Sequence, residues 1–395
     1  MKILLVTEFF PSGKELRFSG GVEARTFFIA KGLAKKNKVI VLASRTSGTP
    51  KKEFIQGFTV FRVGPKRNYT ASAGHALSRL LFIKNAIKLG KSLDVQIVDG
   101  SNYIAHFIAK NIANYKKIPA VAWYPDVWLN DWIKNAGLYG IFGELLERLN
   151  LVRGFDAYIA ISKNTADKLR KFSKKAVHVV YCGVDKKEFL ANYTKFKDPT
   201  IVSVSRLTKY KNLNTLILAF AHLLTKVKNA KLIIIGTGPE QKNLKDQIKA
   251  LNISSKVKIF ANLPRDELIS LYKSAHVFSL PSLVEGFGIA TVEAAIAGLP
   301  YVNSDIPVLR EITKNGKGGY LVDSDNPLDF SQKLQLLLNN SNLYKKKSLE
   351  LRTLADSYNW YDVVLQTENV YKSLLSKNSP LRKMDSLYSK VFSIC

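Results

Sequence analysis

Residues 199–205 have the sequence PTIVSVS, and this segment begins a strand–helix pattern for the second time in the chain. It is a continuous apolar run, as is typical of strands that are covered on both faces. A helix pattern near 212–227 follows it, and more strand and helix patterns alternate beyond that point. Such alternation predicts a parallel, doubly wound sheet.

The first half of the chain has the same alternation, so we predict two Rossmann-like α/β domains, 1–193 and 194–358. The polar segment 193–200 is the expected linker. A helix at about 359–377 is expected to pack back onto the first domain, and 378–395 form a basic and apolar tail. Paired sheets of this kind are expected to bind ligands in a cleft at the C-terminal edges of their strands. The expected strands are 2–9, 38–44, 58–63, 95–100, 120–124 and 157–162, then 199–205, 230–236, 257–261, 275–282 and 299–304.

The composition of the 395 residues narrows the class of protein. A hydrophobic fraction of 46% excludes a disordered or collagen-like chain. The net charge of +29 indicates an anionic partner, which is a nucleic acid, a membrane surface or a phosphorylated ligand. The two cysteines, Cys182 and Cys395, cannot form a disulfide framework or a usual zinc site, so we expect a reducing compartment. The short apolar start, which includes Glu8, indicates a buried strand and not a signal peptide.

Two glycine-containing turns follow predicted strands. Gly20 and Gly21 precede a helix expected from Val22, and the N–H groups there are suited to a phosphate, although an ordinary turn has the same composition. The turn 236–239, GTGP, has Gln241 where a dinucleotide fingerprint has its third glycine. No acidic residue ends a following strand at the expected distance either, so the sequence argues against a dehydrogenase. The chain has no GxxxxGK[ST] motif, which excludes P-loop chemistry.

The most informative segment is 281–293, PSLVEGFGIATVE. Glu285 follows a predicted strand, and Glu293 falls inside a helix expected to begin near Ile289. The N–H groups of 286–289 would form a nest for an anion or a hydroxyl. Carboxylates beside such a nest suit a polyol phosphate, whereas the alternative is an acidic cap in a first helical turn.

A pair of basic residues follows the strand at 199–205. Arg206 offers a planar fork of donors and Lys211 a flexible ammonium, and together they suit a diphosphate. A solvated surface pair is the alternative in so basic a chain.

These motifs together resemble the family 4 glycosyltransferases, which have the GT-B fold of two Rossmann-like domains. The resemblance extends over almost the whole chain. The matching elements are 20–23 (GGVE), 160–162 (AIS), 181–185 (YCGVD), 205–207 (SRL) with Lys211, 236–239 (GTGP), 281–282 (PS) with the Glu285/Glu293 pair, 294–300 (AAIAGLP) and the final helix with Trp360.

The resemblance implies a retaining glycosyltransferase that uses a UDP-, GDP- or ADP-linked sugar, with no metal and no other cofactor. Arg206 and Lys211 would neutralise the diphosphate and stabilise the leaving group. Glu285 and the nest would hold the sugar hydroxyls, and Glu293 the ribose. The pair Asp323 and Asp325 is interpreted as a solvated loop and not as a metal motif. The implied donor-binding residues are Gly21, Arg206, Lys211, Gly236, Glu285, Gly286, Phe287, Gly288, Ile289 and Glu293.

The first domain departs from the family pattern. A His is common near the reacting sugar, but this chain has Pro125 there. Asp126 is then a candidate to orient or deprotonate an acceptor, and we include it with Glu285, Arg206 and Lys211 as a catalytic candidate. His106 is the histidine nearest to Pro125 in sequence, but it falls in a helix pattern, so we expect a packed or a surface His and not a catalytic one. The Pro125 departure leaves open a sugar-nucleotide-binding protein without transfer activity. The acceptor-side candidates are Gly20, Asp99, Tyr124, Asp126 and Trp128.

The excess positive charge is concentrated in the first domain, where 31–90 hold thirteen Lys and Arg against Glu53. The basic amphipathic segment 76–90 is typical of a helix at an anionic membrane, although an ordinary surface helix can have the same pattern. We therefore expect an enzyme at the cytoplasmic face of a membrane with a glycan or lipid-linked acceptor. A nucleic-acid-binding protein is the alternative from charge alone, and no recognised nucleic-acid-binding module supports it.

Overall fold

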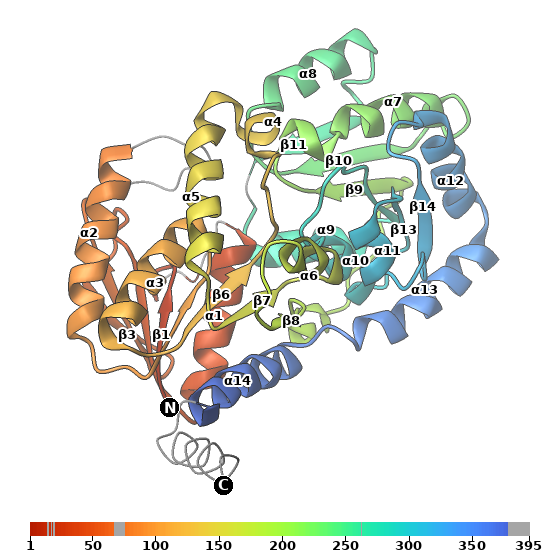
Figure 1. Ribbon diagram of the computed structural model, residues 1–395. Helices are drawn as coiled ribbons and strands as arrows, with labels where there is room; N and C mark the ends of the chain where they lie inside the picture. Colours follow the sequence, from red (N-terminus) through yellow and green to blue (C-terminus); the bar gives the residue numbers. More distant parts are fainter. Residues whose placement is uncertain (14–15, 17, 19, 67–75, 262, 378–395) are drawn as a thin grey trace, which may run out of the picture. The chain divides into compact units, whose positions relative to one another are not determined.

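The computed structural model describes residues 1–377 except 14–15, 17, 19, 67–75 and 262. It contains two compact units, Met1–Tyr181 with the segment from Trp360 onward, and Cys182–Asn359 (Figure 1). The boundary thus precedes the expected one, and 182–193 belong to the second unit. Val184 N–H donates there to the carbonyl of Tyr358 (3.1 Å). The predicted tail, 378–395, lies outside the described residues.

The first unit is built on an eight-stranded sheet in the order β3-β4-β2-β1-β5-β6-β7-β8. All neighbours are parallel except β3 and β4. The central strands are apolar and buried, as the continuous apolar runs require. The strands are β1 (Lys2–Val6), β2 (Lys38–Ser44), β3 (Lys52–Ile55), β4 (Phe58–Val63), β5 (Ile97–Gly100), β6 (Ala120–Tyr124), β7 (Ala157–Ala160) and β8 (Val177–Val179).

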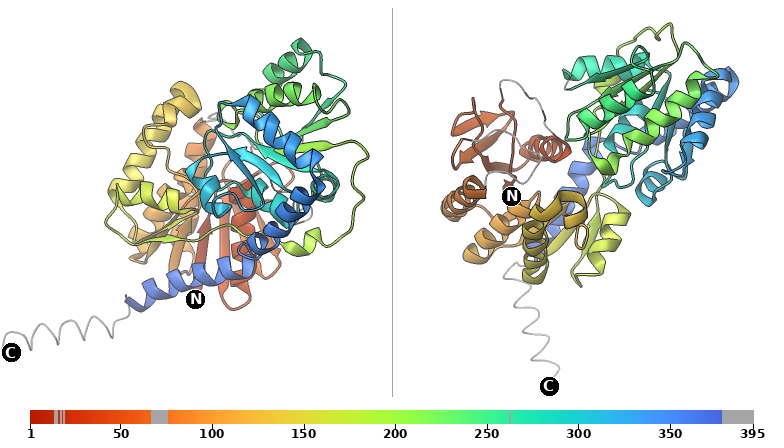
Figure 2. Two further views of the ribbon diagram at one scale, coloured as in Figure 1. Left: turned by 90° about the vertical axis from the view of Figure 1, so that its right-hand side faces the viewer. Right: turned by 90° about the horizontal axis from the view of Figure 1, so that it is seen from above.

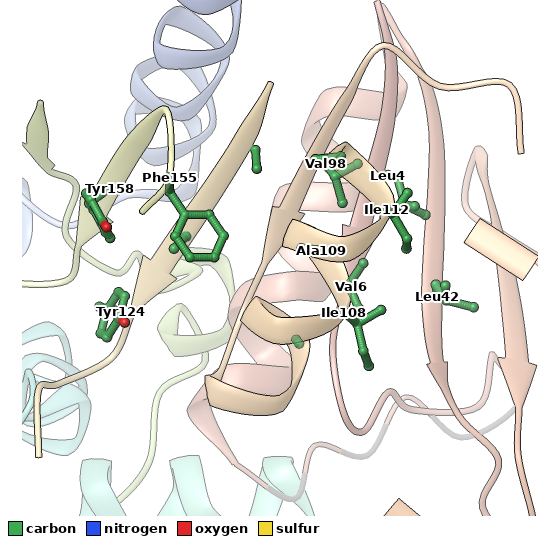
Figure 3. Close-up of a cluster of buried hydrophobic side chains, with 14 of the residues drawn as sticks. Leu4, Val6, Leu42, Val98, Ile108, Ala109, Ile112, Tyr124, Phe155 and Tyr158 are labelled. Carbon is green, nitrogen blue, oxygen red and sulfur yellow. The ribbon is translucent and has the colours of Figure 1, made fainter. Parts of the chain in front are cut away.

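Helices cover this sheet, and apolar side chains of α3 pack on β1 and β5 (Figure 3). On α1, the ring of Phe28 stacks on that of Trp360 from α14, with 4.6 Å between centroids. Asn37, just after α1, donates to Glu368 of α14 (2.9 Å), so α14 belongs to this unit (Figure 2). The helices are α1 (Gly21–Ala34), α2 (Ala76–Ser92), α3 (Tyr103–Lys116), α4 (Trp132–Ala136), the 3-10 turn η1 (Gly137–Tyr139), α5 (Gly140–Arg153), α6 (Lys163–Arg170) and α14 (Trp360–Lys377).

The second unit has a six-stranded, fully parallel sheet in the order β11-β10-β9-β12-β13-β14. Its order reverses between β9 and β12, the position where doubly wound sheets bind their ligands. The loops after β9, β10 and β12 therefore meet at one edge. The strands are β9 (Thr200–Val204), β10 (Lys231–Ile235), β11 (Val257–Phe260), β12 (Val277–Leu280), β13 (Tyr301–Ser304) and β14 (Gly319–Val322).

Helices of the second unit connect consecutive strands, as parallel pairing requires. Those that bear on the site are α9, which begins at Arg265, and α10, which begins directly after the glycine-rich segment. The helical elements are η2 (Lys186–Phe189), η3 (Lys209–Lys211), α7 (Leu213–Leu224), α8 (Gln241–Ala250), α9 (Arg265–Ser274), α10 (Ile289–Ile296), α11 (Pro307–Ile312), α12 (Pro327–Asn339) and α13 (Ser341–Ala355).

The predicted fold class is confirmed, because both units are parallel α/β sheets of the doubly wound type. Three strands were not predicted, β3, β8 and β14. All three are short. β3 (KEFI) and β8 (VHV) contain charged or polar residues, whereas β14 (GYLV) is an apolar run of only four residues that the prediction missed. Among the helices that the structure describes, none has the length and apolar composition needed to cross a membrane.

Candidate functional site

The loops after β9 and β12 bring two predicted residues into direct contact. The Lys211 ammonium forms an ion pair with Oε1 of Glu285, and their side chains are only 11% and 8% exposed. Ser282 Oγ donates to the same carboxylate oxygen (2.9 Å). Asn212, which follows the lysine, adopts the left-handed conformation (φ 53°) that its short side chain tolerates. Lys211 and Glu285, 74 residues apart, thus form one largely desolvated charged pair.

The glycine turn after β10 packs on the loop that carries Arg206. A Cβ at Gly236 would collide with the carbonyl oxygen of Ser205, and one at Gly238 with that of Leu207. The two loops are also joined by a bond from Leu207 N–H to the carbonyl of Thr237 (2.9 Å). Glycine is therefore required here by backbone packing. This reason is structural and does not depend on a ligand.

Arg206 is exposed, in contrast to Lys211. Its guanidinium carbon lies 5.8 Å from the ring centroid of Tyr210, and the Lys211 ammonium lies 5.6 Å from the same centroid. Tyr210 also accepts the N–H of Leu283 at its carbonyl (2.8 Å), so it fixes the β9 loop against the β12 loop. Sequence reasoning missed Tyr210. Lys211 is thus held in place by Glu285, whereas Arg206 remains accessible to an anionic ligand.

The glycine-rich segment 286–288 leads into α10 as expected. Gly288 is the residue before the helix and has φ 84°, a conformation that favours glycine. A Cβ there would also lie 2.9 Å from Cδ2 of Leu309. Phe287 is buried, its ring 5.7 Å from that of Tyr358, while Gly286 and Ile289 are half-buried. The helix start therefore follows the Lys211–Glu285 pair directly in sequence, and the first turn of a helix is a position that suits an anion.

Glu293 lies within α10 and has protein partners on both oxygens. Arg265 Nη1 donates to Oε1 (2.5 Å), and the Tyr272 hydroxyl donates to Oε2 (3.1 Å). The same guanidinium also forms an ion pair with Glu188 of η2 (2.8 Å). Glu188 and Glu293 raise the pKa of Arg265 against the opposing effect of burial. Glu293 is thus separate from the Lys211–Glu285 pair within this structure, and the resemblance did not identify its partners.

In the first unit, the predicted glycines lie at the start of α1. Gly20 is the residue before the helix, with an extended backbone, and its carbonyl accepts the N–H of Ala24 (3.2 Å). Gly21 is exposed, and a Cβ at this position would meet no described atom within 4 Å. Packing in the described residues therefore gives no reason for glycine at 21, unlike Gly236.

Asp126 follows β6, but its carboxylate is engaged by neighbouring donors. Oδ1 accepts from the N–H of Val127 (2.8 Å) and from Lys168 Nζ (2.8 Å), and Oδ2 accepts from Trp128 Nε1 (3.2 Å). Burial raises the pKa of Asp126, and Lys168 opposes this shift. The structure thus gives Asp126 and half-buried Trp128 a role in holding the segment after β6. In this structure the Asp126 carboxylate is engaged on both oxygens and is not a free general base.

Asp99 is also in a structural network and not at an open rim. It is 1% exposed on β5, and the Tyr371 hydroxyl of α14 donates to its Oδ2. Arg25 Nη2 lies 3.7 Å from the same oxygen, and its guanidinium is 4.4 Å from the Trp123 ring centroid. The expectation that Asp99 faces an acceptor is wrong in this structure, because its side chain points toward α14.

Tyr124 belongs to the core. It is 0% exposed at the end of β6 and lies among the core side chains (Figure 3). Its ring is 4.5 Å from that of His106, whose Nε2 contacts the carbonyl of Trp123 (2.9 Å). Burial lowers the pKa of His106 to about 4. Of the two expectations for His106, packed or on the surface, the structure shows the packed one. Tyr124 is fully buried and does not reach a ligand in this conformation.

Within the part of the chain that the structure describes, no group of three or more His, Cys, Asp or Glu side chains has the arrangement of a metal site. Asp323 and Asp325 lie in a turn after β14, where the N–H of Asp325 donates to Oδ1 of Asp323 (3.1 Å).

The fold and the family models define the class of protein. Two doubly wound α/β units, with motif loops at the β9/β12 edge, are those of a GT-B glycosyltransferase. A model described as Glycosyltransferase Family 4 matches 19–188, and one described as Glycosyl transferases group 1 matches 185–350. The chain belongs to the family 4 glycosyltransferases.

Similar proteins agree with this assignment. An uncharacterised glycosyltransferase of Methanocaldococcus jannaschii is 27% identical over 94% of this chain and 98% of its own. A D-inositol 3-phosphate glycosyltransferase of Corynebacterium urealyticum is 30% identical over 43% of this chain and 42% of its own. Among solved structures, sucrose-phosphate synthase of Thermosynechococcus elongatus has a TM-score of 0.81 at 15% identity, covering 96% of this chain and all of its own. Anabaena HepE, solved with UDP and glucose, has a TM-score of 0.72 at 18% identity, covering 95% and 100%.

Proposed function

We propose that this glycosyltransferase takes its sugar from a nucleotide-sugar donor bound by the second unit and transfers it with retention of anomeric configuration. The observation that carries the proposal is the buried ion pair between Lys211 and Glu285. Removing two charges from water is costly. A largely buried charged pair is therefore a candidate for a functional site. A pair between the loops of β9 and β12 lies at the edge where this fold binds ligands.

The chemistry follows from the charges of the site. When the glycosidic bond to the donor breaks, negative charge develops on the leaving diphosphate. Lys211 and Arg206 would meet that charge, together with the N–H groups at the start of α10. Fixed donors in a largely desolvated site act without the reorganisation that water requires. No metal ion is needed in this scheme, because cationic side chains supply the charge.

The sugar and ribose would be bound by the two glutamates. Glu285 would accept from sugar hydroxyls once the diphosphate competes for Lys211. Glu293 would bind the ribose hydroxyls, which requires that it share Arg265 or Tyr272 with the ligand. Gly21, at which a Cβ would meet no described atom within 4 Å, leaves space at the start of α1 for close approach of the donor or acceptor.

The acceptor we propose is a glycan or lipid-linked molecule at the cytoplasmic face of a membrane. The support for it is the excess of basic residues in the first unit, which two donor-site cations cannot account for. Within 31–90 there are thirteen Lys and Arg against a single acidic residue. Such a surface attracts anionic lipid head groups or phosphorylated acceptors.

A thermal-shift screen with UDP-, GDP- and ADP-sugars tests the donor proposal. A ligand that binds only the folded protein stabilises it by mass action, by about 2.7 kcal/mol at a concentration one hundred times its Kd. We expect one nucleotide series to raise the melting temperature and Lys211→Ala to abolish that shift. A shift that Lys211→Ala leaves unchanged would contradict the proposed site. A shift without release of nucleoside diphosphate would favour a sugar-nucleotide-binding protein without transfer activity.

A further inference from the structure

Helix α5 of the first unit is amphipathic in the opposite sense to an ordinary surface helix. The buried residues of α5 are Gly140, Glu147, Asn150 and Leu151, and Leu151 is the large apolar one among them. Glu147 and Asn150 are both 0% exposed. Gly140 and Gly143 lie against Trp132, where any Cβ would collide with it. Apart from Leu151, which joins the core, most of the large apolar side chains of α5 are therefore exposed.

The outward side chains form a regular stripe. On α5 they recur at helical spacing, so they lie along one side of that helix. Leu138 on η1 and Ile133 on α4, in the elements just before α5, are exposed as well. Contiguous exposed apolar surface of this kind marks an interaction site in soluble proteins. We call this set the α5 stripe: Ile133 (55% exposed), Leu138 (80%), Ile141 (45%), Phe142 (75%), Leu145 (60%), Leu149 (43%) and Val152 (85%).

Basic helices lie beside the α5 stripe. α5 packs on α3, and α3 packs on α2, so the three helices form one layer (Figure 1). α2 carries four Lys or Arg and α3 carries two, and neither helix contains Asp or Glu. Leu77 and Leu80 on α2 are also 71% and 62% exposed. The layer therefore combines an apolar stripe with a positively charged flank.

The buried acid on α5 fits this arrangement. Glu147 Oε2 accepts from Trp132 Nε1 (2.6 Å) and from the N–H of Trp128 (3.3 Å). Glu147 thereby ties α5 to α4 and to the segment after β6, and it holds the α5 stripe outward. These hydrogen bonds attach α5 to the protein through a polar residue, so its exposed apolar side chains are not needed for that attachment.

We propose that the α5 stripe inserts into the surface of an anionic lipid bilayer, with α2 and α3 held at the lipid head groups. The inference deepens the proposed function, since it rests on an acceptor at a membrane. Apolar side chains of an interfacial helix bury in the outer acyl region, and each Lys or Arg near an anionic surface adds attraction. A second copy of this chain fits less well, because α2 and α3 of both copies would bring like charges together.

Co-sedimentation with vesicles tests this proposal. The probes are phosphatidylcholine vesicles with and without phosphatidylglycerol, at low and high salt. We expect the wild-type chain to bind the anionic vesicles, and Phe142→Ser with Leu145→Ser to weaken binding at least about tenfold. The matched control is Leu328→Ser with Leu349→Ser, two residues that are 55% and 58% exposed on the second unit. The control should bind as the wild type does, and salt should weaken both.

Two results would overturn the proposal. One is unchanged vesicle binding by the α5 stripe variant. The other is a wild-type dimer in sedimentation equilibrium that this variant converts to monomer, which would identify a second copy as the occupant. Release of nucleoside diphosphate from the donor without vesicles is measured in parallel and should be equal in variant and control. Loss of release in every protein would instead contradict the proposed function and leave the vesicle result intact.

Discussion

The candidate residues of the second unit converge on one site, whereas those of the first unit are divided among separate structural networks. Lys211 and Glu285 come from loops 74 residues apart and meet in a single ion pair. Asp99 faces α14 and Asp126 is bound to Lys168. The unit that matches the family motifs most densely is therefore also the unit in which the predicted side chains lie together.

The difference shows that a spaced motif predicts site residues better than the position of a residue at the end of a strand does. The glycine and glutamate spacing of the second unit specifies a loop and a helix start, so the side chains that it names share an environment. In the first unit, the candidates were chosen because they lie at or near the ends of strands. Successive side chains of a strand point to opposite faces, so position alone cannot say which side chain reaches the edge.

The largest effect is expected from the second unit. Glu285→Gln removes the charge that pairs with Lys211 but keeps the side-chain volume. Removing one preorganised group of this kind costs roughly a factor of 100 to 1,000 in turnover. Initial rates of nucleoside diphosphate release at saturating donor measure it, with the melting temperature as the check on folding. Turnover within about threefold of the wild type would show that Glu285 does not take part in transfer.

A structural role for Asp126 predicts a loss of stability and not of chemistry. Asp126→Ala leaves Val127 N–H and the Trp128 indole without their acceptor, at a cost of about 2–3 kcal/mol. Urea denaturation of the variant measures this cost. Donor hydrolysis per folded molecule should be retained. If instead stability is unchanged and hydrolysis is lost, Asp126 is catalytic and the contrast between the units fails.

The buried acid on α5 predicts a pH-dependent stability in the first unit. Burial raises the pKa of Glu147 to about 8, above its value of 4.5 when exposed. The folded chain therefore holds a proton that the unfolded chain has lost, and this contribution to stability disappears as pH rises toward 8. Glu147→Gln should lack the dependence. Its stability relative to the wild type should rise by about 2 kcal/mol between about pH 6 and 7.5, measured by urea denaturation at both pH values. If the difference in the free energy of unfolding between Glu147→Gln and the wild type is the same at both pH values, the raised pKa of Glu147 is contradicted.

The smallest expected effect concerns the attachment of α14. Tyr371→Phe removes one hydrogen bond to the buried Asp99 carboxylate, and we expect a loss of about 1 kcal/mol in the free energy of unfolding. Hydrogen exchange of α14 amides should increase, because the helix opens more readily. Tyr361→Phe is the control, since Tyr361 on the same helix is 75% exposed. If both substitutions have equal effects, the hydrogen bond from Tyr371 to Asp99 does not attach α14, and the structural role of Asp99 is contradicted.

Most of the fold could be predicted because its strands are continuous apolar runs. β1, β6 and β12 are examples, with nearly every residue buried. β8 was not predicted, because it has only three residues, all half-buried, and a histidine in the middle. β14 was missed although its four residues are apolar, and its two central side chains are half-buried. The domain boundary also differed, because the chain after Tyr181 is held by contacts with residues near 358, which no local pattern reveals.

The site was predictable where backbone requirements show in the sequence. Gly288 needs a positive φ and Gly236 needs close backbone approach, so both positions carry a visible signal. Arg265 carries none, since it is one of 60 Lys and Arg residues and only the folded chain brings it to Glu293. The inverted polarity of α5 is likewise visible only when the buried face is known.

The most direct test of the central claim is the turnover of Lys211→Ala, measured as release of nucleoside diphosphate from the donor found in the thermal-shift screen. Lys209→Ala is the matched control, because Lys209 is exposed on the same 3-10 turn. The account predicts that Lys211→Ala lowers turnover at least about 100-fold, while Lys209→Ala stays near the wild-type rate. Near-normal turnover of a folded Lys211→Ala variant would contradict the assignment of the β9/β12 edge as the site of transfer.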